Sequence, residues 1–275
     1  MGNNEKFGKK LGFIGAGNMA TAIMSGIVSG EIFHADEIIM SDVSDSRLAF
    51  LSEKYGVETT TDNTAVAKGA EVIILAVKPQ YYTQVITEIA PFVTEEQLII
   101  TIAPGQTLSS LSERFGSDKL KIIRTMPNTP AMVGAGITAA TPNANVTDDE
   151  LAYVRRILGG FGISEVIGEN LMDAVVSVSG SSPAYVFMFI EAMADAAVAD
   201  GMPRAQAYRF AAQAVMGSAK MVLETGKHPG ELKDMVCSPA GTTIEAVRVL
   251  EEKGLRSAVI EAMQACTERS RSLGK

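Results

Sequence analysis

The stretch Leu11-Gly12-Phe13-Ile14-Gly15-Ala16-Gly17-Asn18-Met19-Ala20 decides the fold of this chain. Residues 11–14 form a short apolar run that predicts a buried strand, and helical spacing begins at residue 19. Between them, Gly15 permits a tight turn, Gly17 lets a pyrophosphate approach the backbone, and Ala20 is small enough for close contact between helix and strand. This strand–turn–helix predicts a dinucleotide site at Gly15, Ala16, Gly17, Asn18, Met19 and Ala20, although a purely structural glycine turn would show the same pattern.

The first half of the chain alternates short apolar runs with helical segments. Strands that are apolar on both faces and separated by helices predict a parallel sheet covered on both sides. Residues 136–141 and 164–167 are candidates for two more strands, with a helix at 148–158 between them. The other expected strands are 11–14, 37–42, 72–77, 98–103 and 121–126, and the helices between them are 19–29, 47–55, 80–92 and 108–115.

The strand signals stop after Gly168. We therefore predict an α/β chain with an N-terminal Rossmann-type parallel sheet domain at 1–168 and an all-α C-terminal domain at 169–275. The helices of the second domain are apolar or small nearly all round and must bury more than one face, as in a dimerisation domain shared between subunits. A compact monomeric bundle is the alternative. The expected helices are 183–199, 204–224, 231–236, 243–252 and 255–271.

The composition argues against several classes of function. The net charge of −8 and the lack of a Lys/Arg cluster disfavour a nucleic-acid partner or an anionic membrane surface. Cys237 and Cys266 have no metal-ligand spacing, which predicts no metal site and a reduced compartment. The first residues, MGNNEKFGKK, lack the apolar segment of a signal peptide. The apolar stretch 175–190 is broken by Ser, Gly and Pro, so we expect no membrane span and a cytoplasmic protein.

Asp42, at the end of the second expected strand, bears on the choice of cofactor. A carboxylate at this position accepts a hydrogen bond from the ribose 2′-OH of NADH and repels the 2′-phosphate of NADPH. Ser44, Ser46 and Arg47 follow closely and would hold that phosphate if Asp42 pointed away. Ser44 and Asp45 are also suited to capping the next helix. The choice between NADH and NADPH stays open, with Asp42 favouring NADH.

Two further loops follow expected strands at the carboxyl edge of the sheet, where ligands of open α/β folds bind. One is Ala76-Val77-Lys78-Pro79, and the other is Ala103-Pro104-Gly105. Lys78 could contact a phosphate or the substrate, although an exposed loop lysine would look the same.

The run Cys237-Ser238-Pro239-Ala240-Gly241-Thr242-Thr243 interrupts the helical half of the chain. Small polar residues broken by Pro and Gly cannot continue a helix, and they expose backbone N–H groups and hydroxyls. Helical spacing resumes at Ile244, so we expect Thr242 or Thr243 to cap the next helix and leave its N-terminal N–H groups facing outward. Such a turn suits a small carboxylate.

No obvious acid–base pair, nucleophile or metal cluster accompanies these two sites. His34 and His228 are far apart in the sequence, and no base motif lies beside Cys237. A dinucleotide site together with a hydroxyl-rich turn fits hydride transfer, in which the cofactor supplies the chemistry and the protein positions the partners.

The segment 232–246, LKDMVCSPAGTTIEA, resembles the signature of pyrroline-5-carboxylate reductases. Supporting matches are GFIGAG at 12–17, LAVKP at 75–79, SGSSPAY at 179–185 and HPG at 228–230, and the similarity covers nearly the whole chain from Lys10. The resemblance implies reduction of 1-pyrroline-5-carboxylate to L-proline by hydride transfer from NADPH or NADH, the last step of proline biosynthesis. It also implies a homodimer or a larger ring such as a decamer.

The same resemblance implies roles for individual residues. Thr243 would be the catalytic residue and hydrogen-bond the ring nitrogen. Ser238 and the N–H groups of Gly241 and Thr242 would hold the carboxylate, with Val236 against the ring. On the cofactor side it implies Asn63 together with Gly15 to Ala20, Ala76 to Pro79 and Ala103 to Gly105.

The chain departs from the family pattern at two places. Ala240 stands where members often have Gly, which should leave the turn intact, and Asp42-Val43 stands where NADPH-using members commonly have Arg or Ser. Two rival functions remain. A related β-hydroxyacid dehydrogenase or imine reductase would place a catalytic Lys on the helix at 183–199, which has none. A dinucleotide-binding scaffold would bind the cofactor without oxidising it.

Overall fold

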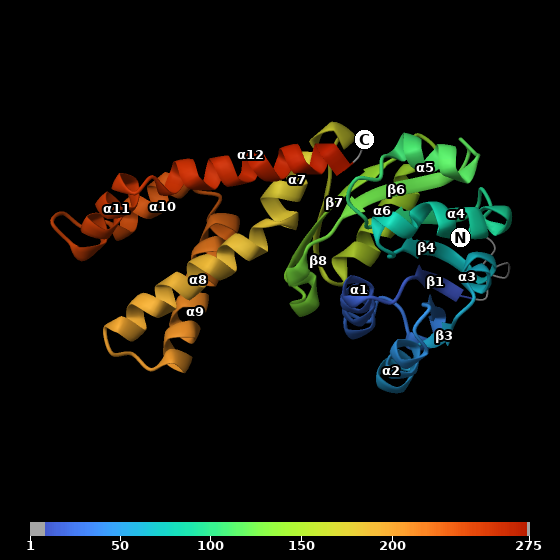
Figure 1. The fold of residues 1–275 in the computed structure, drawn as a ribbon, viewed down its shortest axis with the longest axis horizontal. Coiled ribbons are helices and arrows are strands. Elements are labelled where there is room, and N and C mark those ends of the chain that lie inside the picture. The colour runs from blue at the N-terminus through green and yellow to red at the C-terminus, as the bar shows by residue number, and fades with distance from the viewer. Residues whose placement is uncertain (1–8, 274–275) are drawn as a thin grey trace. The chain divides into compact units, whose positions relative to one another are not determined.

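A computed structural model describes residues 9–273 of the chain (Figure 1). The prediction that no signal peptide begins the chain concerns residues that lie mostly outside this range. The described chain forms two compact units: one runs to Gly180 and resumes at Thr267, and the other is Ser181–Cys266. The domain boundary that we expect near residue 168 stays a prediction. The two compact units divide the chain at a different position, between Gly180 and Ser181.

The first unit is built on one mostly parallel sheet, in the order β3-β2-β1-β4-β5-β6-β7-β8. The expected Rossmann-type parallel sheet is confirmed, and within it β7 is antiparallel to β6. The connection between these two strands is too short for the crossover that parallel neighbours need. The strands are β1 (Lys9–Ile14), β2 (Ile38–Ser41), β3 (Glu58–Thr60), β4 (Ala70–Leu75), β5 (Leu98–Thr101), β6 (Lys121–Met126), β7 (Gly136–Pro142) and β8 (Gly162–Val166).

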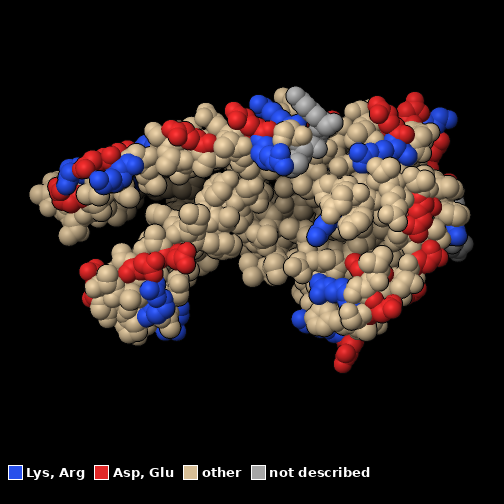
Figure 2. Space-filling view, in the orientation of Figure 1, with Lys and Arg blue, Asp and Glu red and all other residues tan. Residues whose placement is uncertain are grey.

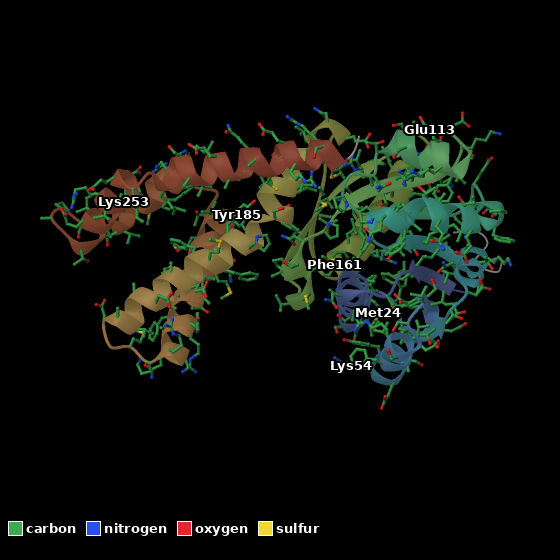
Figure 3. The ribbon with its side chains drawn as sticks, in the orientation of Figure 1. Met24, Lys54, Glu113, Phe161, Tyr185 and Lys253 are labelled. Carbon is green, nitrogen blue, oxygen red and sulfur yellow. The ribbon has the colours of Figure 1, made fainter. Side chains whose placement is uncertain are left out.

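Helices cover both faces of this sheet and bury two apolar clusters. One cluster packs α1 (Asn18–Ser29), α2 (Asp45–Tyr55) and α6 (Asp148–Gly159) against the strands, and it includes the fully buried Met24 and Phe161 (Figure 3). The other cluster lies under α3, α4 and α5. This doubly wound arrangement places the carboxyl ends of β1, β2 and β4 side by side. The helices of the second face are α3 (Asn63–Gly69), α4 (Tyr82–Ile89) and α5 (Leu108–Phe115).

Among residues 169–273 the regular elements that the structure describes are all helices, joined by short turns. The segment 169–199 contains a short 3₁₀ turn (Glu169–Leu171), α7 (Met172–Val175), a π-helical turn (Val176–Gly180) and α8 (Ser182–Ala199). By length and composition alone it is apolar enough to cross a membrane, and little of it is buried within the chain. The helices that follow are α9 (Arg204–Thr225), α10 (Pro229–Val236), α11 (Thr242–Glu252) and α12 (Leu255–Leu273).

Candidate active site

The glycine turn between β1 and α1 has the geometry of a phosphate cradle. Gly15 has a φ of +97°, and a Cβ on it would lie 2.9 Å from the backbone of Ala76, so no other residue fits there without strain. Gly17 precedes α1, and a Cβ on it would meet no protein atom within 4 Å. No side chain caps α1, so its first N–H groups can bind an anion. The turn therefore fits a dinucleotide pyrophosphate.

A cavity of about 550 Å³ opens beside this turn, at the carboxyl ends of β1, β2 and β4. Seven of the predicted cofactor residues line it, and they come from the segments that follow four different strands, β1 to β4. The helix α4 and the turn before it also contribute lining residues. The lining residues are Gly15, Gly17, Asp42, Val43, Thr61, Asn63, Ala76, Val77, Lys78, Tyr81, Gln84, Val85 and Glu88.

The remaining predicted cofactor residues do not line this cavity. Ala16 and Ala20 are buried behind the turn and pack in the core of the first unit. Asn18 and Met19 begin α1, and Pro79 begins the 3₁₀ turn before α4. The loop from Ala103 to Gly105 follows β5 and is absent from the cavity wall. Their contacts with a cofactor stay predictions.

The sequence does not reveal the side of the cavity formed by Tyr81, Gln84 and Glu88. Tyr81 and Glu88 are exposed, and all three flank the buried stripe of α4. Polar residues on the outer side of an amphipathic helix look the same in sequence whether they face solvent or a ligand. Among the predicted cofactor residues, Asn63 contacts this side of the cavity, since its Nδ2 donates to the Glu88 carboxylate at 2.9 Å.

Two backbone N–H groups, from Ala16 and Ser44, hold the Asp42 carboxylate in place. Its Oδ2 accepts a hydrogen bond from the Ala16 N–H at 2.8 Å, and its Oδ1 accepts one from the Ser44 N–H at 3.0 Å. Arg47 reaches the same turn, with Nε donating to the Ala16 carbonyl at 2.8 Å and Nη2 donating to Thr21 Oγ1 at 2.7 Å. Both polar groups of the Ala16 backbone are thus bound by side chains that follow β2.

The polar turn lies in the second unit, between α10 and α11. The Gly241 N–H donates to the Ser238 carbonyl at 3.0 Å, and a Cβ on Gly241 would collide with Ser238 Oγ. Gly241 is the N-cap of α11, which corrects the expectation that Thr242 or Thr243 caps it. The threonines instead occupy the first turn, because Gly241 takes the extended cap conformation, and no side chain binds the helix N–H groups.

This turn presents several hydrogen-bond donors without any side-chain cap. Ser238 and Thr242 are exposed and Thr243 is half-buried. The Gly241 N–H already closes the turn, so the N–H groups of Thr242 and Thr243 are the donors that α11 offers to an anion. Val236, which ends α10, is 63% exposed and supplies an apolar surface nearby in the chain.

Comparison with known proteins matches both halves of the chain to oxidoreductase families. Residues 169–273 match the family model for pyrroline-5-carboxylate reductase dimerisation, and residues 10–105 match that for NADP oxidoreductase coenzyme F420-dependent. The pyrroline-5-carboxylate reductase of Escherichia coli is 57% identical over 267 residues, covering 97% of this chain and 99% of that protein.

Solved structures resemble the whole chain as well. A pyrroline-5-carboxylate reductase from Coxiella burnetii superposes with a TM-score of 0.89 at 35% identity, covering 98% of this chain and 99% of the other. The Plasmodium falciparum pyrroline carboxylate reductase, solved with NADP bound, gives 0.88 at 31% identity, covering 97% and 98%. With a matching dimerisation region, a fitting dinucleotide cavity and relatives that align from end to end, the chain belongs to the pyrroline-5-carboxylate reductase family.

Proposed function

We propose that the cavity beside the glycine turn binds the cofactor of a pyrroline-5-carboxylate reductase and that the polar turn 237–243 binds its substrate. Family membership makes the chain an NAD(P)H-dependent oxidoreductase that reduces 1-pyrroline-5-carboxylate to L-proline. NAD(P)H supplies the hydride when it is bound. The observation that carries the assignment of the substrate half is the uncapped start of α11, whose N–H groups suit a carboxylate.

On the cofactor side, the task of the protein is to bind and orient the dinucleotide. The open space at Gly17 and the uncapped start of α1 would receive the pyrophosphate. Asn63 and the loop Ala76-Val77-Lys78 lie further along the cavity wall. Lys78 is the cation among the lining residues and is available for a phosphate. These residues need no chemistry of their own, because holding the reactants in place supplies much of the rate enhancement in hydride transfer.

On the substrate side, each group of the turn has a distinct task. The Ser238 hydroxyl and the N–H of Thr242 would hold the carboxylate, and Val236 would pack against the ring. The Gly241 N–H, which the resemblance also implies for the carboxylate, donates to the Ser238 carbonyl instead. The Thr243 hydroxyl would hydrogen-bond the ring nitrogen, orient the imine and relay a proton to it from water. A protonated imine is already electrophilic, so no further acid or nucleophile is required.

Replacement of Thr243 by Ala tests this assignment. We expect kcat/KM for the pyrroline to fall about ten- to a hundredfold, the effect of losing one hydrogen bond to a charged group. Thr243→Ser keeps the hydroxyl and should recover most of the activity, whereas the isosteric Thr243→Val should not. The measurement is steady-state oxidation of NADH and NADPH, together with thermal unfolding to show that each variant is folded. Unchanged kcat and KM in Thr243→Ala would refute the role.

The same assay separates the two rival functions. A β-hydroxyacid dehydrogenase or imine reductase would act on a different substrate, and α8 offers no lysine for such chemistry. A scaffold would bind the dinucleotide yet show no oxidation that depends on the pyrroline. The chain contains a region that associates with a second copy. We further propose that the enzyme works in the cytoplasm as a homodimer or a larger ring such as a decamer.

A further inference from the structure

We infer that Asp42 makes this chain bind NADH in preference to NADPH. The inference rests on the proposed function only in that a nicotinamide dinucleotide occupies the cavity beside Gly15 and Gly17. A solved relative at 31% identity has NADP bound, so family membership by itself does not decide the preference. The local structure after β2 decides it in this chain.

The Asp42 carboxylate cannot turn away from the cavity without losing two hydrogen bonds. Its two oxygens accept N–H groups that lie on different segments, Ala16 in the glycine turn and Ser44 in the loop that follows. The Asp42 backbone N–H is also held, by the Thr60 carbonyl at 3.3 Å. Asp42 lines the cavity in this fixed position. A carboxylate has about four acceptor positions, so two remain for a ribose 2′-OH.

The residues that could hold a 2′-phosphate have other partners. Arg47 directs Nε to the Ala16 carbonyl and Nη2 to Thr21 Oγ1, and its guanidinium lies 5.5 Å from the centre of the Phe50 ring. Ser44 Oγ caps α2 by accepting the Arg47 N–H, and it lies 3.2 Å from Ser46 Oγ. These contacts hold Arg47 and Ser44 in place, so they could serve a 2′-phosphate only with their remaining donors.

The charges on the cavity wall also oppose an additional phosphate. Asp42 and Glu88 contribute two carboxylates, and Lys78 is the cation among the lining residues. Asn63 fixes Glu88 by donating to its carboxylate at 2.9 Å, while Asn63 Oδ1 accepts a hydrogen bond from Ser41 at 2.7 Å. A 2′-phosphate carries close to two negative charges and would be repelled by a fixed carboxylate at short range. A 2′-hydroxyl would be a donor to the same group.

The test is binding of NADH and NADPH to the full chain without any pyrroline, followed by nicotinamide fluorescence. We expect NADH to bind about tenfold more tightly or better, and the ratio of the two Kd values to shrink as salt is added, because salt screens the repulsion. Asp42→Asn keeps the shape and removes the charge, so the ratio should move about tenfold toward NADPH. Asp45→Asn is the matched control, since Asp45 is an exposed carboxylate in the first turn of α2, and it should leave the ratio unchanged.

Three results would overturn the inference. One is a wild-type chain that binds NADPH as tightly as NADH, and another is an Asp42→Asn ratio equal to that of the wild type. If Asp42→Asn does not fold, the variant is replaced by a competition experiment, in which 2′,5′-ADP and 5′-ADP displace NADH from the wild-type chain. Equal displacement by the two nucleotides is the third result that would overturn the inference. Equal binding would overturn this inference alone, because reduction of the pyrroline would continue with either cofactor. Failure to bind either dinucleotide would overturn the proposed function and this inference together.

Discussion

Ala240 carries backbone strain in the polar turn. Its φ of +55° lies in the left-handed region. Residues other than Gly adopt this conformation at a cost in free energy, because their Cβ crowds the backbone. The turn requires this conformation, since the chain must reverse between Ser238 and Gly241, whose carbonyl and N–H are joined by a hydrogen bond. The alanine thus leaves the turn intact, as expected from sequence, but in a strained state.

Replacing Ala240 with Gly should relieve that strain and raise the free energy of unfolding by up to about 1 kcal/mol. The opposite sign is expected for Ala246→Gly in α11, where Ala246 is exposed inside a helix and Gly should lower stability by about 1 kcal/mol. Urea unfolding of the two variants measures both effects. A loss of stability in Ala240→Gly equal to that in Ala246→Gly would contradict this account of the turn.

At the scale of elements, a partly buried ion pair joins β6 to the start of the segment 169–199. Arg124 on β6 is 6% exposed at its side chain, and its Nη1 donates to Glu169 Oε1 at 3.0 Å. The same oxygen accepts the Leu108 N–H at the start of α5 at 2.8 Å, where a negative charge is favoured. One carboxylate therefore ties together a strand, a helix and the first turn of the segment that follows β8.

Glu169→Ala should cost about 3 kcal/mol of unfolding free energy, because it leaves the buried Arg124 charge without a partner. A double variant, Arg124→Met with Glu169→Leu, should recover much of that loss, since it removes both charges. Glu165→Ala on β8 is the control, because Glu165 is exposed and its loss should change stability by no more than about 0.5 kcal/mol. Equal effects of Glu169→Ala and Glu165→Ala in urea unfolding would show that the pair contributes nothing.

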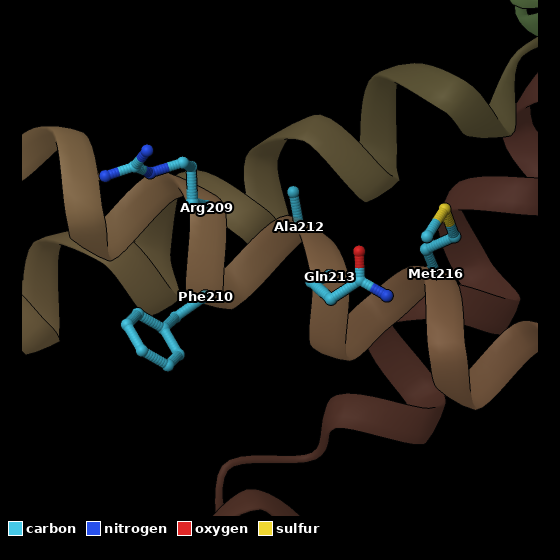
Figure 4. A pocket seen from close by; sticks show the side chains of 5 residues that line it. All are labelled: Arg209, Phe210, Ala212, Gln213 and Met216. Carbon is cyan, nitrogen blue, oxygen red and sulfur yellow. The ribbon is translucent and has the colours of Figure 1, made fainter.

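At the scale of the whole molecule, the helical unit leaves much apolar surface uncovered within one chain. On α8, Val186, Phe187, Met188 and Phe189 are all between 39% and 69% exposed. A hollow on α9 is lined by Arg209, Phe210, Ala212, Gln213 and Met216 (Figure 4). Charged side chains of both signs follow α10 and α11, whereas the surface over the middle of α8 is largely uncharged (Figure 2). Because residues 169–273 match the family's dimerisation region, we expect a second copy to bury this surface.

We therefore expect the midpoint of thermal unfolding to rise with protein concentration, as it does when association stabilises the folded state. Phe187→Glu combined with Met188→Glu should weaken association, measured by analytical ultracentrifugation, and should remove the dependence on concentration. Lys253→Glu is the control, since that side chain is 74% exposed after α11. A double variant that sediments like the wild type would show that this face of α8 lies outside the interface.

Most elements of the fold could be predicted from sequence because their signals are local. The strand at 121–126 and the helix at 108–115 have the predicted bounds, and the glycine turn follows β1 as expected. β3 and α3 were missed because Glu58–Thr60 is a short polar edge strand, and Asn63–Gly69 is too short for a clear helical period. The cap of α11 was predicted wrongly because Gly241 and the threonines are all good capping residues, and only the backbone angles distinguish them.

The sequence by itself determined the two-part character of this protein, because a glycine turn after a strand and a polar break between helices each depend on neighbouring residues. Only the tertiary structure decided what Asp42 and Arg47 do. Both bind Ala16, which lies 26 and 31 residues away in the chain. It also placed Glu88 and Asp42 on the wall of one cavity. Contacts of this kind arise from the packing of β2 and α4 around β1, and no local pattern of residues encodes them.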